Sequence, residues 1–391
     1  MEEIIKVLHI GADNIGYGGR SVIAFNLAQH MNNKIIHNDF LALKKINNYF
    51  ERLINDTNGK ILEVSIIKST PRIKFEVERT RKIIKAIKTE KYDIVHIHAD
   101  HAYEAMKSVW IAQKAGVKKF VIHAHTAGNN KDYSVLKKCI IHFCQIIIAR
   151  QTYMQVACSN EAALYLFGKK NRNKKYIIND GIDSSLFKYD SSSRKKKREY
   201  LGFKEDELVI GCVGRLAPSK NHIYLLRVFE EIKKIEPNAR LILIGDGELK
   251  EKLRNVCKNK GLTESVNFLG NRNDVPELMQ AMDVFVLPSL FEGFGIVNIE
   301  AQCAGLPCVL SDGIPKSVKI TELVTFLPLE LKPEIWAETI LYLVMQNQRA
   351  DRSSDVCNTG FDIRTSGKKV EEIYCKMMDK DTEIKKRRGL C

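Results

Sequence analysis

The chain has 391 residues, of which 45% are apolar and 28% are charged. This balance is typical of a soluble globular protein, and the length suits two domains of about 150–200 residues. No apolar run reaches the roughly 18 residues that a membrane-spanning helix needs, and the acidic N-terminus does not resemble a secretion signal. The ten cysteines are scattered without a C-x-x-C pair. This excludes a zinc ribbon or disulfide framework and favours a reducing, cytoplasmic compartment.

The net charge of +15 is concentrated in the first half of the chain. Residues 1–185 contain 29 Lys and Arg against 17 Asp and Glu, whereas the remainder contains 33 against 30. A basic half attracts phosphate-rich partners such as anionic lipid headgroups or pyrophosphate-linked substrates. A well-solvated basic surface is the alternative. Nucleic acid is not an expected partner, because the sequence contains none of the usual nucleic-acid-binding motifs.

In the first half, apolar runs of strand length alternate with segments of helical period. The first run leads into a glycine-rich loop, residues 11–19, and then a helix. Strands and helices that alternate at this spacing predict βαβ units on a parallel sheet. The predicted strands are residues 4–10, 61–67, 94–98 and 120–124, and the predicted helices are residues 21–31, 75–88 and 103–115.

The alternation breaks at residues 179–194, a polar and turn-rich stretch that we interpret as a linker. It then restarts, so the sequence predicts two doubly wound α/β domains, residues 1–183 and 184–366. The strands predicted in the second half are residues 208–213, 240–244, 266–269, 284–287 and 308–311, and the helices are residues 222–235, 249–260, 296–304, 333–345 and 367–378.

Loops that lead from a strand to a helix are where open α/β sheets bind their ligands. The loop of residues 16–19 has the glycines that a phosphate site needs, but it matches no established phosphate-binding pattern. In the loop of residues 214–221, Arg215 and Lys220 bracket a proline-containing turn and could clamp a diphosphate. A solvated basic turn is the alternative. The turn of residues 245–248 is more simply a helix cap.

Residues 288–300 form the most informative loop, between a buried strand and a helix. Glu292 falls in the loop and Glu300 about one turn inside the helix, so both carboxylates could accept hydrogen bonds from sugar or ribose hydroxyls. They could also be the acid and nucleophile of a glycosidase, and their spacing alone leaves this open. The neighbouring phosphate-binding loops favour a nucleotide ligand.

This segment resembles the E-x7-E motif of retaining glycosyltransferases of family 4, since seven residues separate Glu292 from Glu300. The stretches GRLAPSKN, IGDGELK, NFLGNRNDVPELM, DVFVLPSLFEGFG and AQCAGLPCVLSD resemble the same family in the same order. The similarity covers nearly the whole chain and is closest to the bacterial capsule and exopolysaccharide branch. It implies a GT-B fold, in which two Rossmann-like domains face a central cleft with the donor on the second. It also implies that a C-terminal helix, residues 367–391, packs back on the first domain.

The resemblance implies a role for each matching residue. Arg215 and Lys220 would bind the donor diphosphate and help to carry the charge of the leaving group. Glu292 would contact the donor sugar, and Glu300 the ribose hydroxyls. Backbone amides for the phosphates would come from Gly293, Phe294 and Gly295.

In the first half, Gly18 and Gly19 match the glycine loop that lies near donor and acceptor in the family. Arg20 and Ser21 follow it, where many members carry an acidic residue. His125 matches the family's histidine beside the donor sugar and is predicted to be catalytic; a polar residue at a strand end is its alternative. The family implies no metal, and no cofactor besides the nucleotide-sugar substrate.

His96, His98, Asp100 and His101 form a literal H-x-H-x-D-H pattern, the spacing of dinuclear zinc hydrolases, and His123 and His125 are close by. However, residues 92–98 have the pattern of a strand, and family 4 members often carry D-I-V-H-x-H there. A zinc-dependent hydrolase therefore remains an alternative function. A non-catalytic protein that binds a nucleotide sugar or a glycan on the same fold is another.

We predict a hexosyltransferase that moves a sugar from a UDP-sugar to a glycan or lipid-linked glycan acceptor with retention, in the synthesis of a cell-surface polysaccharide. Residues 72–91 and 131–150 are basic and amphipathic and could bind an anionic membrane. For residues 131–150, a core helix is the alternative. The expected location is the cytoplasm, including the inner face of the cell membrane.

Overall fold

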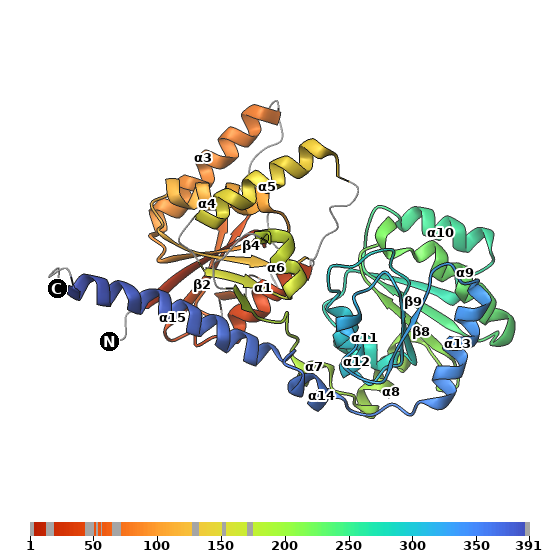
Figure 1. Ribbon diagram of the computed structural model, residues 1–391. Coiled ribbons are helices and arrows are strands. Elements are labelled where there is room, and N and C mark those ends of the chain that lie inside the picture. The colour runs from red at the N-terminus through yellow and green to blue at the C-terminus, as the bar shows by residue number, and fades with distance from the viewer. Residues whose placement is uncertain are drawn as a thin grey trace. The chain divides into compact units, whose positions relative to one another are not determined.

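The computed structural model describes residues 4–12, 19–43, 51, 54–55, 57–64, 72–126, 133–150, 154–169 and 175–387. The chain forms two compact units (Figure 1). The first consists of Met1–Gly181 and Ile363–Cys391, and the second of Ile182–Asp362. Across the described ranges, none of the helices combines the length and the apolar character needed to cross a lipid bilayer.

Within its described residues, the first unit contains a seven-stranded parallel sheet in the order β3-β2-β1-β4-β5-β6-β7. Its strands are β1 (Ile5–Ile10), β2 (Ile36–Ala42), β3 (Ile61–Glu63), β4 (Ile94–Ala99), β5 (Lys119–Ala124), β6 (Met154–Ala157) and β7 (Lys175–Ile177). Its helices are α1 (Gly19–Gln29), α3 (Arg72–Glu90), α4 (Ala102–Lys114), α5 (Val135–Arg150), α6 (Asn160–Phe167) and α15 (Ile363–Arg387).

The helices of the first unit cover both faces of its sheet (Figure 1). Apolar residues of α1 and α15 pack with Val7, Ile94 and Val121 on one face, and those of α3 and α4 pack with Leu8 and Val95 on the other. Because parallel strands are buried on both faces, most of their residues are apolar. The last helix thus completes the core of the first unit, although it follows the second unit in the chain.

The second unit contains a six-stranded parallel sheet in the order β10-β9-β8-β11-β12-β13, and all of its residues are described. Its strands are β8 (Val209–Val213), β9 (Arg240–Ile244), β10 (Val266–Gly270), β11 (Val284–Leu287), β12 (Cys308–Ser311) and β13 (Val324–Leu327). Its α-helices are α7 (Ser184–Phe187), α8 (Ser191–Leu201), α9 (His222–Ile235), α10 (Lys250–Asn259), α11 (Val275–Ala281), α12 (Val297–Cys303), α13 (Pro333–Gln346) and α14 (Ser353–Asn358), and 3-10 turns lie at Pro218–Lys220, Thr263–Ser265 and Lys316–Val318.

The structure confirms the predicted class of two parallel-sheet α/β domains, with differences in detail. Residues 179–194 are not a plain linker, since they include α7 and the start of α8. Asp183 and Asp190 cap these helices by accepting hydrogen bonds from Ser185 N and Ser193 N. The chain passes from the first unit to the second at Gly181–Ile182, inside this stretch. Aspartate and serine favour helix starts as well as turns, so two helices begin in the rest of it.

Candidate active site

Loops that follow four strands gather at the carboxyl edge of the sheet of the second unit. They follow β8, β9, β11 and β12, and β8 and β11 are hydrogen-bonded neighbours in the middle of the sheet. The direction in which strands are added reverses between these two, so loops on either side diverge and leave room for a ligand. The predicted residues Arg215, Lys220 and Glu292 lie in the loops after β8 and β11.

Glycines hold the loops after β8 and β9 against each other. A Cβ atom at Gly245, where φ is +130°, would lie 2.1 Å from Gly214 O, and one at Gly247 would lie 2.5 Å from Leu216 O. Leu216 N–H also donates to Asp246 O at 3.0 Å. The segment that carries Arg215 is therefore fixed through its backbone by Gly245–Glu248. The prediction that this turn caps a helix was wrong, because the N-cap of α10 is Leu249 and no side chain caps it.

Lys220 and Glu292 form an ion pair between the two central loops, with side chains that are only 17% and 10% exposed. Ser289 Oγ also donates to Glu292 Oε1 at 2.7 Å. The carboxylate is thus held from two sides by a cation and a hydroxyl. The stem of Lys220 lies against Gly214, where a Cβ would be 3.3 Å from Lys220 Cε.

A row of backbone amides in the loop after β11 finds no acceptor in the part of the chain that the structure describes. Among the described residues, the N–H groups of Gly293, Phe294, Gly295 and Ile296 donate to no protein acceptor. Gly295 has φ +74°, and Asn298 Nδ2 braces the loop by donating to Gly295 O at 2.8 Å. Successive N–H groups that point out of a tight turn form a concave site for an anion.

Glu300 lies in α12 on the carboxyl side of this loop and is half-buried. Among the described residues, no hydrogen-bond or ion-pair partner reaches its carboxylate. Burial raises the pKa of Glu300 from its ordinary 4.5 to about 7. A desolvated carboxyl group without a protein partner has unused capacity to accept hydrogen bonds.

Arg215 lies apart from the Lys220–Glu292 pair. Its side chain is 71% exposed, and its guanidinium contacts Glu248 at 3.1 Å. Exposed ion pairs contribute about 0–1 kcal/mol to stability, so Arg215 can exchange Glu248 for another anion at little cost in free energy.

In the first unit, five histidines cluster on the sheet face that α1 and α15 cover. Strand register puts His9 beside His96 and His98 beside His123. His125 follows β5 directly and is 7% exposed. Its Nε2 is 2.8 Å from His98 Nδ1, and its Nδ1 is 3.2 Å from Asp180 Oδ1. Both ring nitrogens of this predicted catalytic residue are therefore hydrogen-bonded within the protein.

The H-x-H-x-D-H pattern does not converge on one site. His96 Nδ1 bonds the hydroxyl of Tyr374 in α15, whereas Asp100 contacts Arg20 at 3.1 Å and His101 Nδ1 bonds Tyr165 OH at 3.0 Å. Within the described ranges, the triads close enough to hold a metal consist of histidines alone: His9, His96 and His98, and His98, His123 and His125.

Gly18 lies outside the described residues, and Gly19 is the first residue of α1. Sequence reasoning missed Ser289, Asn38, His9 and Asp180 as parts of the two sites. Only Asp180 had a local signal, because an acidic residue follows the apolar run of β7.

Two family models match the chain, Glycosyltransferase Family 4 over residues 17–186 and Glycosyl transferases group 1 over residues 193–352. EpsF of Bacillus subtilis, named as a glycosyltransferase, is 31% identical over 339 residues, which are 86% of this chain and 86% of EpsF. This chain belongs to the group 1 glycosyltransferases.

The group 1 relatives include CapH of Staphylococcus aureus, named as a capsular polysaccharide biosynthesis glycosyltransferase. CapH is 25% identical over 305 residues, which are 75% of this chain and 79% of CapH. The solved structure of HepE from Anabaena in complex with UDP and glucose covers 95% of this chain and 99% of HepE, with a TM-score of 0.74 and 18% identity. These comparisons confirm the predicted family and the GT-B fold of this group 1 glycosyltransferase.

Proposed function

We propose that this glycosyltransferase moves a hexosyl group from a UDP-sugar to a glycan or lipid-linked glycan acceptor, with retention of anomeric configuration, in cell-surface polysaccharide synthesis. One observation carries the proposal. The row of unpaired amides at residues 293–296 lies between Glu292, which is paired with Lys220, and Glu300, which has no described partner. An anion site flanked by two carboxylates suits a phosphate that carries a sugar on one side and a ribose on the other.

Each part of the donor has a matching group in the second unit. The four amides would donate to phosphate oxygens, and Glu300 would accept from the ribose hydroxyls. Lys220 would hold the diphosphate as charge develops on it, and Arg215 would leave Glu248 to do the same. Glu292, fixed by Lys220 and Ser289, would orient the donor sugar. His125 of the first unit completes the proposed catalytic set.

The choice of UDP draws support from HepE, whose structure holds UDP and glucose, and the choice of product from the name of CapH. Retention is proposed from resemblance alone, since the segment with Glu292 and Glu300 resembles the E-x7-E motif of retaining glycosyltransferases. No metal or further cofactor is part of the proposal, because Lys220, Arg215 and the loop amides supply the positive charge that a diphosphate leaving group needs.

The test is a screen of nucleotide sugars with purified protein, with mass spectrometry to measure release of the free nucleoside diphosphate, with and without a metal chelator. We expect chelator-insensitive release from one UDP-sugar. Glu292→Ala and Lys220→Ala should abolish it, whereas Glu251→Gln, at a carboxylate 77% exposed on α10, should not change it.

Two other results would overturn the proposal. Tight binding of a nucleotide sugar without turnover would identify a non-catalytic binding protein. Absence of binding and release, together with stoichiometric zinc in the protein, would favour the hydrolase alternative.

We also propose that the first unit binds an anionic membrane surface through α5. This helix buries Cys144 and Ile148 but exposes apolar side chains on its opposite face. Their exposed fractions are 79% for Val135, 72% for Leu136, 48% for Ile140, 61% for Phe143 and 38% for Ile146. An apolar face of this kind marks an interaction site, and a core helix would not leave it exposed.

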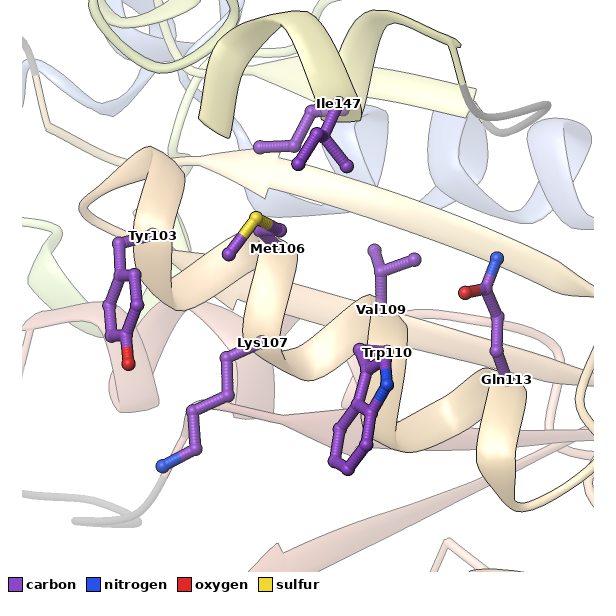
Figure 2. A pocket seen from close by; sticks show the side chains of 8 residues that line it. Tyr103, Met106, Lys107, Val109, Trp110, Gln113 and Ile147 are labelled. Carbon is purple, nitrogen blue, oxygen red and sulfur yellow. The ribbon is translucent and has the colours of Figure 1, made fainter. Parts of the chain in front are cut away.

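Charge and shape next to α5 favour a lipid surface. Helix α3, on the other side of α4 from α5, exposes Lys74, Arg81, Lys85 and Lys88. Figure 2 shows a pocket of about 400 Å³ between α4 and α5, with Ile147 pointing toward Met106. The residues that line it are Tyr103, Met106, Lys107, Val109, Trp110, Gln113, Ile147 and Ile148. Exposed Tyr and Trp beside an apolar pocket suit the boundary between lipid chains and water.

Vesicle flotation tests the membrane proposal. Phosphatidylglycerol vesicles should bind the protein and phosphatidylcholine vesicles should not. Phe143→Ser should weaken vesicle binding roughly tenfold. Insertion of part of an aromatic ring into lipid contributes about 1.5 kcal/mol, and the variant loses this contribution. Met345→Ser, at a side chain 83% exposed in the second unit, is the control. The proposal would be contradicted if Phe143→Ser bound vesicles as well as wild type does. It would also be contradicted if wild type formed a dimer that Phe143→Ser abolished.

A further inference from the structure

A continuous chain of hydrogen-bonded side chains crosses the sheet of the first unit. It runs from Asn38 through His9, His98 and His125 to Asp180. The four links measure 3.0 Å, 2.9 Å, 2.8 Å and 3.2 Å in that order. Every member is at least nine-tenths buried. Since no solvent can complete a missing bond, the protons along the chain can be counted.

With three neutral imidazoles and an ionised Asp180, the count comes out one proton short. Asn38 presents its carbonyl oxygen Oδ1 to His9, while its Nδ2 donates to Met31 Sδ at 3.7 Å. The chain thus begins and ends on an acceptor, with three imidazoles between. Four links need four protons, but a neutral imidazole carries only one N–H. Reversing the Asn38 amide would supply the fourth proton, but would place its oxygen against the sulfur of Met31, which has no proton to donate.

Burial restricts which group can hold the additional proton. It lowers the pKa of His9 to about 4 and that of His98 well below the ordinary value. Both are therefore neutral and donate from Nε2 toward the Asn38 end of the chain. The additional proton is left to the link between His125 Nδ1 and Asp180.

A negative charge on Asp180 would need the same proton on His125 to balance it. Its carboxylate is 2% exposed, and the thiol of Cys158 donates to it. Among the described residues no Lys or Arg is paired with Asp180, and its histidine contacts are His125 at 3.2 Å and His123 at 4.0 Å. A buried carboxylate without a cation costs several kcal/mol.

The other titratable groups around the chain are neutral. Burial lowers the pKa values of His96 and His123 well below the ordinary value and raises those of Cys158 and Tyr374 well above it. None of them supplies a positive charge to Asp180.

We propose that His125 is a fixed imidazolium, protonated on both ring nitrogens, and that Asn38, His9 and His98 are positioning residues that hold it in this state with Asp180. His125 then has no free lone pair, so it neither accepts nor transfers a proton. Resting on the proposed function, this gives His125 a role in the catalytic set that is electrostatic and involves no proton transfer.

The test is nuclear magnetic resonance of the full-length protein with ¹⁵N-labelled histidine at neutral pH. Wild type should show His125 protonated on both nitrogens, and His9 and His98 on Nε2 alone. Asp180→Asn removes the charge and donates an amide proton to Nδ1, so His125 should become neutral while His9 and His98 keep their tautomers. Asn38→Leu should change the tautomer of His98, which Asn38 does not contact.

Tyr374→Phe is the matched control, since it removes the partner of His96 and leaves the chain intact. The signals of His9, His98 and His125 should keep their protonation states. A bare nitrogen on His125 in wild type would overturn the proposal, as would stoichiometric metal bound by His98, His123 and His125. An unchanged His98 in Asn38→Leu would show that the chain is not coupled. None of these measurements needs turnover, so they remain decisive even if no sugar donor is found.

Discussion

Replacing Glu300 with glutamine should make the protein more stable and at the same time a weaker nucleotide binder. Because the pKa of Glu300 is about 7 in the folded protein and ordinarily 4.5, the folded state binds more protons between these values. Stability therefore falls as pH rises through this window and stays low above it. One unit on the pKa scale corresponds to about 1.4 kcal/mol, so the ionised carboxylate costs about 3 kcal/mol at about pH 8. Glu300→Gln removes this cost.

Urea unfolding of wild type and Glu300→Gln at two pH values measures the effect. The variant should be more stable by about 3 kcal/mol at about pH 8 and by about 1 kcal/mol at about pH 5. Affinity for UDP, measured by calorimetry, should fall roughly 10- to 100-fold, because a hydrogen bond to a charged group contributes about 1.5–3 kcal/mol. Glu236→Gln, at an exposed glutamate, should change neither quantity. A variant no more stable than wild type at the higher pH would refute the reasoning.

Three further predictions concern the second unit. Gly247→Ala would put a Cβ 2.5 Å from Leu216 O, so it should cost about 1–3 kcal/mol in urea unfolding and weaken UDP binding by displacing the loop that carries Arg215. Arg198→Met leaves the carbonyl groups of Ala281 and Lys204 without this donor, while Asp283 keeps Arg194, so unfolding should become easier by about 1–3 kcal/mol; a smaller loss than that of an exposed Arg254→Met would contradict this. Trp336→Phe removes the indole bond to Pro328 O at 3.1 Å and should cost about 1 kcal/mol with UDP affinity unchanged, as thermal unfolding and calorimetry can check.

Local patterns were enough to predict most strands of the second unit, because buried parallel strands are apolar nearly throughout. They were insufficient for β2, whose sequence IHNDFLA contains Asn38 and Asp39. Both residues are buried because distant groups satisfy them: Tyr92 OH donates to Asp39 Oδ2 at 2.7 Å, and His9 bonds Asn38. From sequence alone, polar residues such as Asn38 and Asp39 predict a loop, because the partners that allow their burial lie in another part of the chain.

The two candidate sites also differ in how far apart in the sequence their interacting residues lie. Glu292 and Glu300 were predicted from their spacing within one loop and one helix, and Lys220 from a single turn, so these predictions needed short-range sequence alone. The chain from Asn38 to Asp180 depends on the order and register of strands far apart in the sequence. The hydrophobic period of a single strand indicates neither the order of the strands nor their register. The hydrogen bonds of His125 could therefore not be predicted from the sequence.

For the α5 segment, sequence alone left a core helix and a surface helix open. Apolar residues dominate this basic segment, and periodicity does not show which of them face the protein. The burial of Cys144 and the exposure of Phe143 decide the question, because adjacent residues of a helix point in different directions.

The chain enters the second unit at Ile182 and leaves it at Asp362. Ile182 N–H donates to Phe361 O at 2.8 Å, and Ile182 and Asp362 form an isolated parallel bridge. In topological terms residues 182–362 are a cassette inserted into one αβ domain, with both junctions side by side. Residues 182–362 could therefore be exchanged for the matching segment of another group 1 enzyme by joining two adjacent splice points. The core that α15 completes would remain intact, so neither fold would have to be rebuilt.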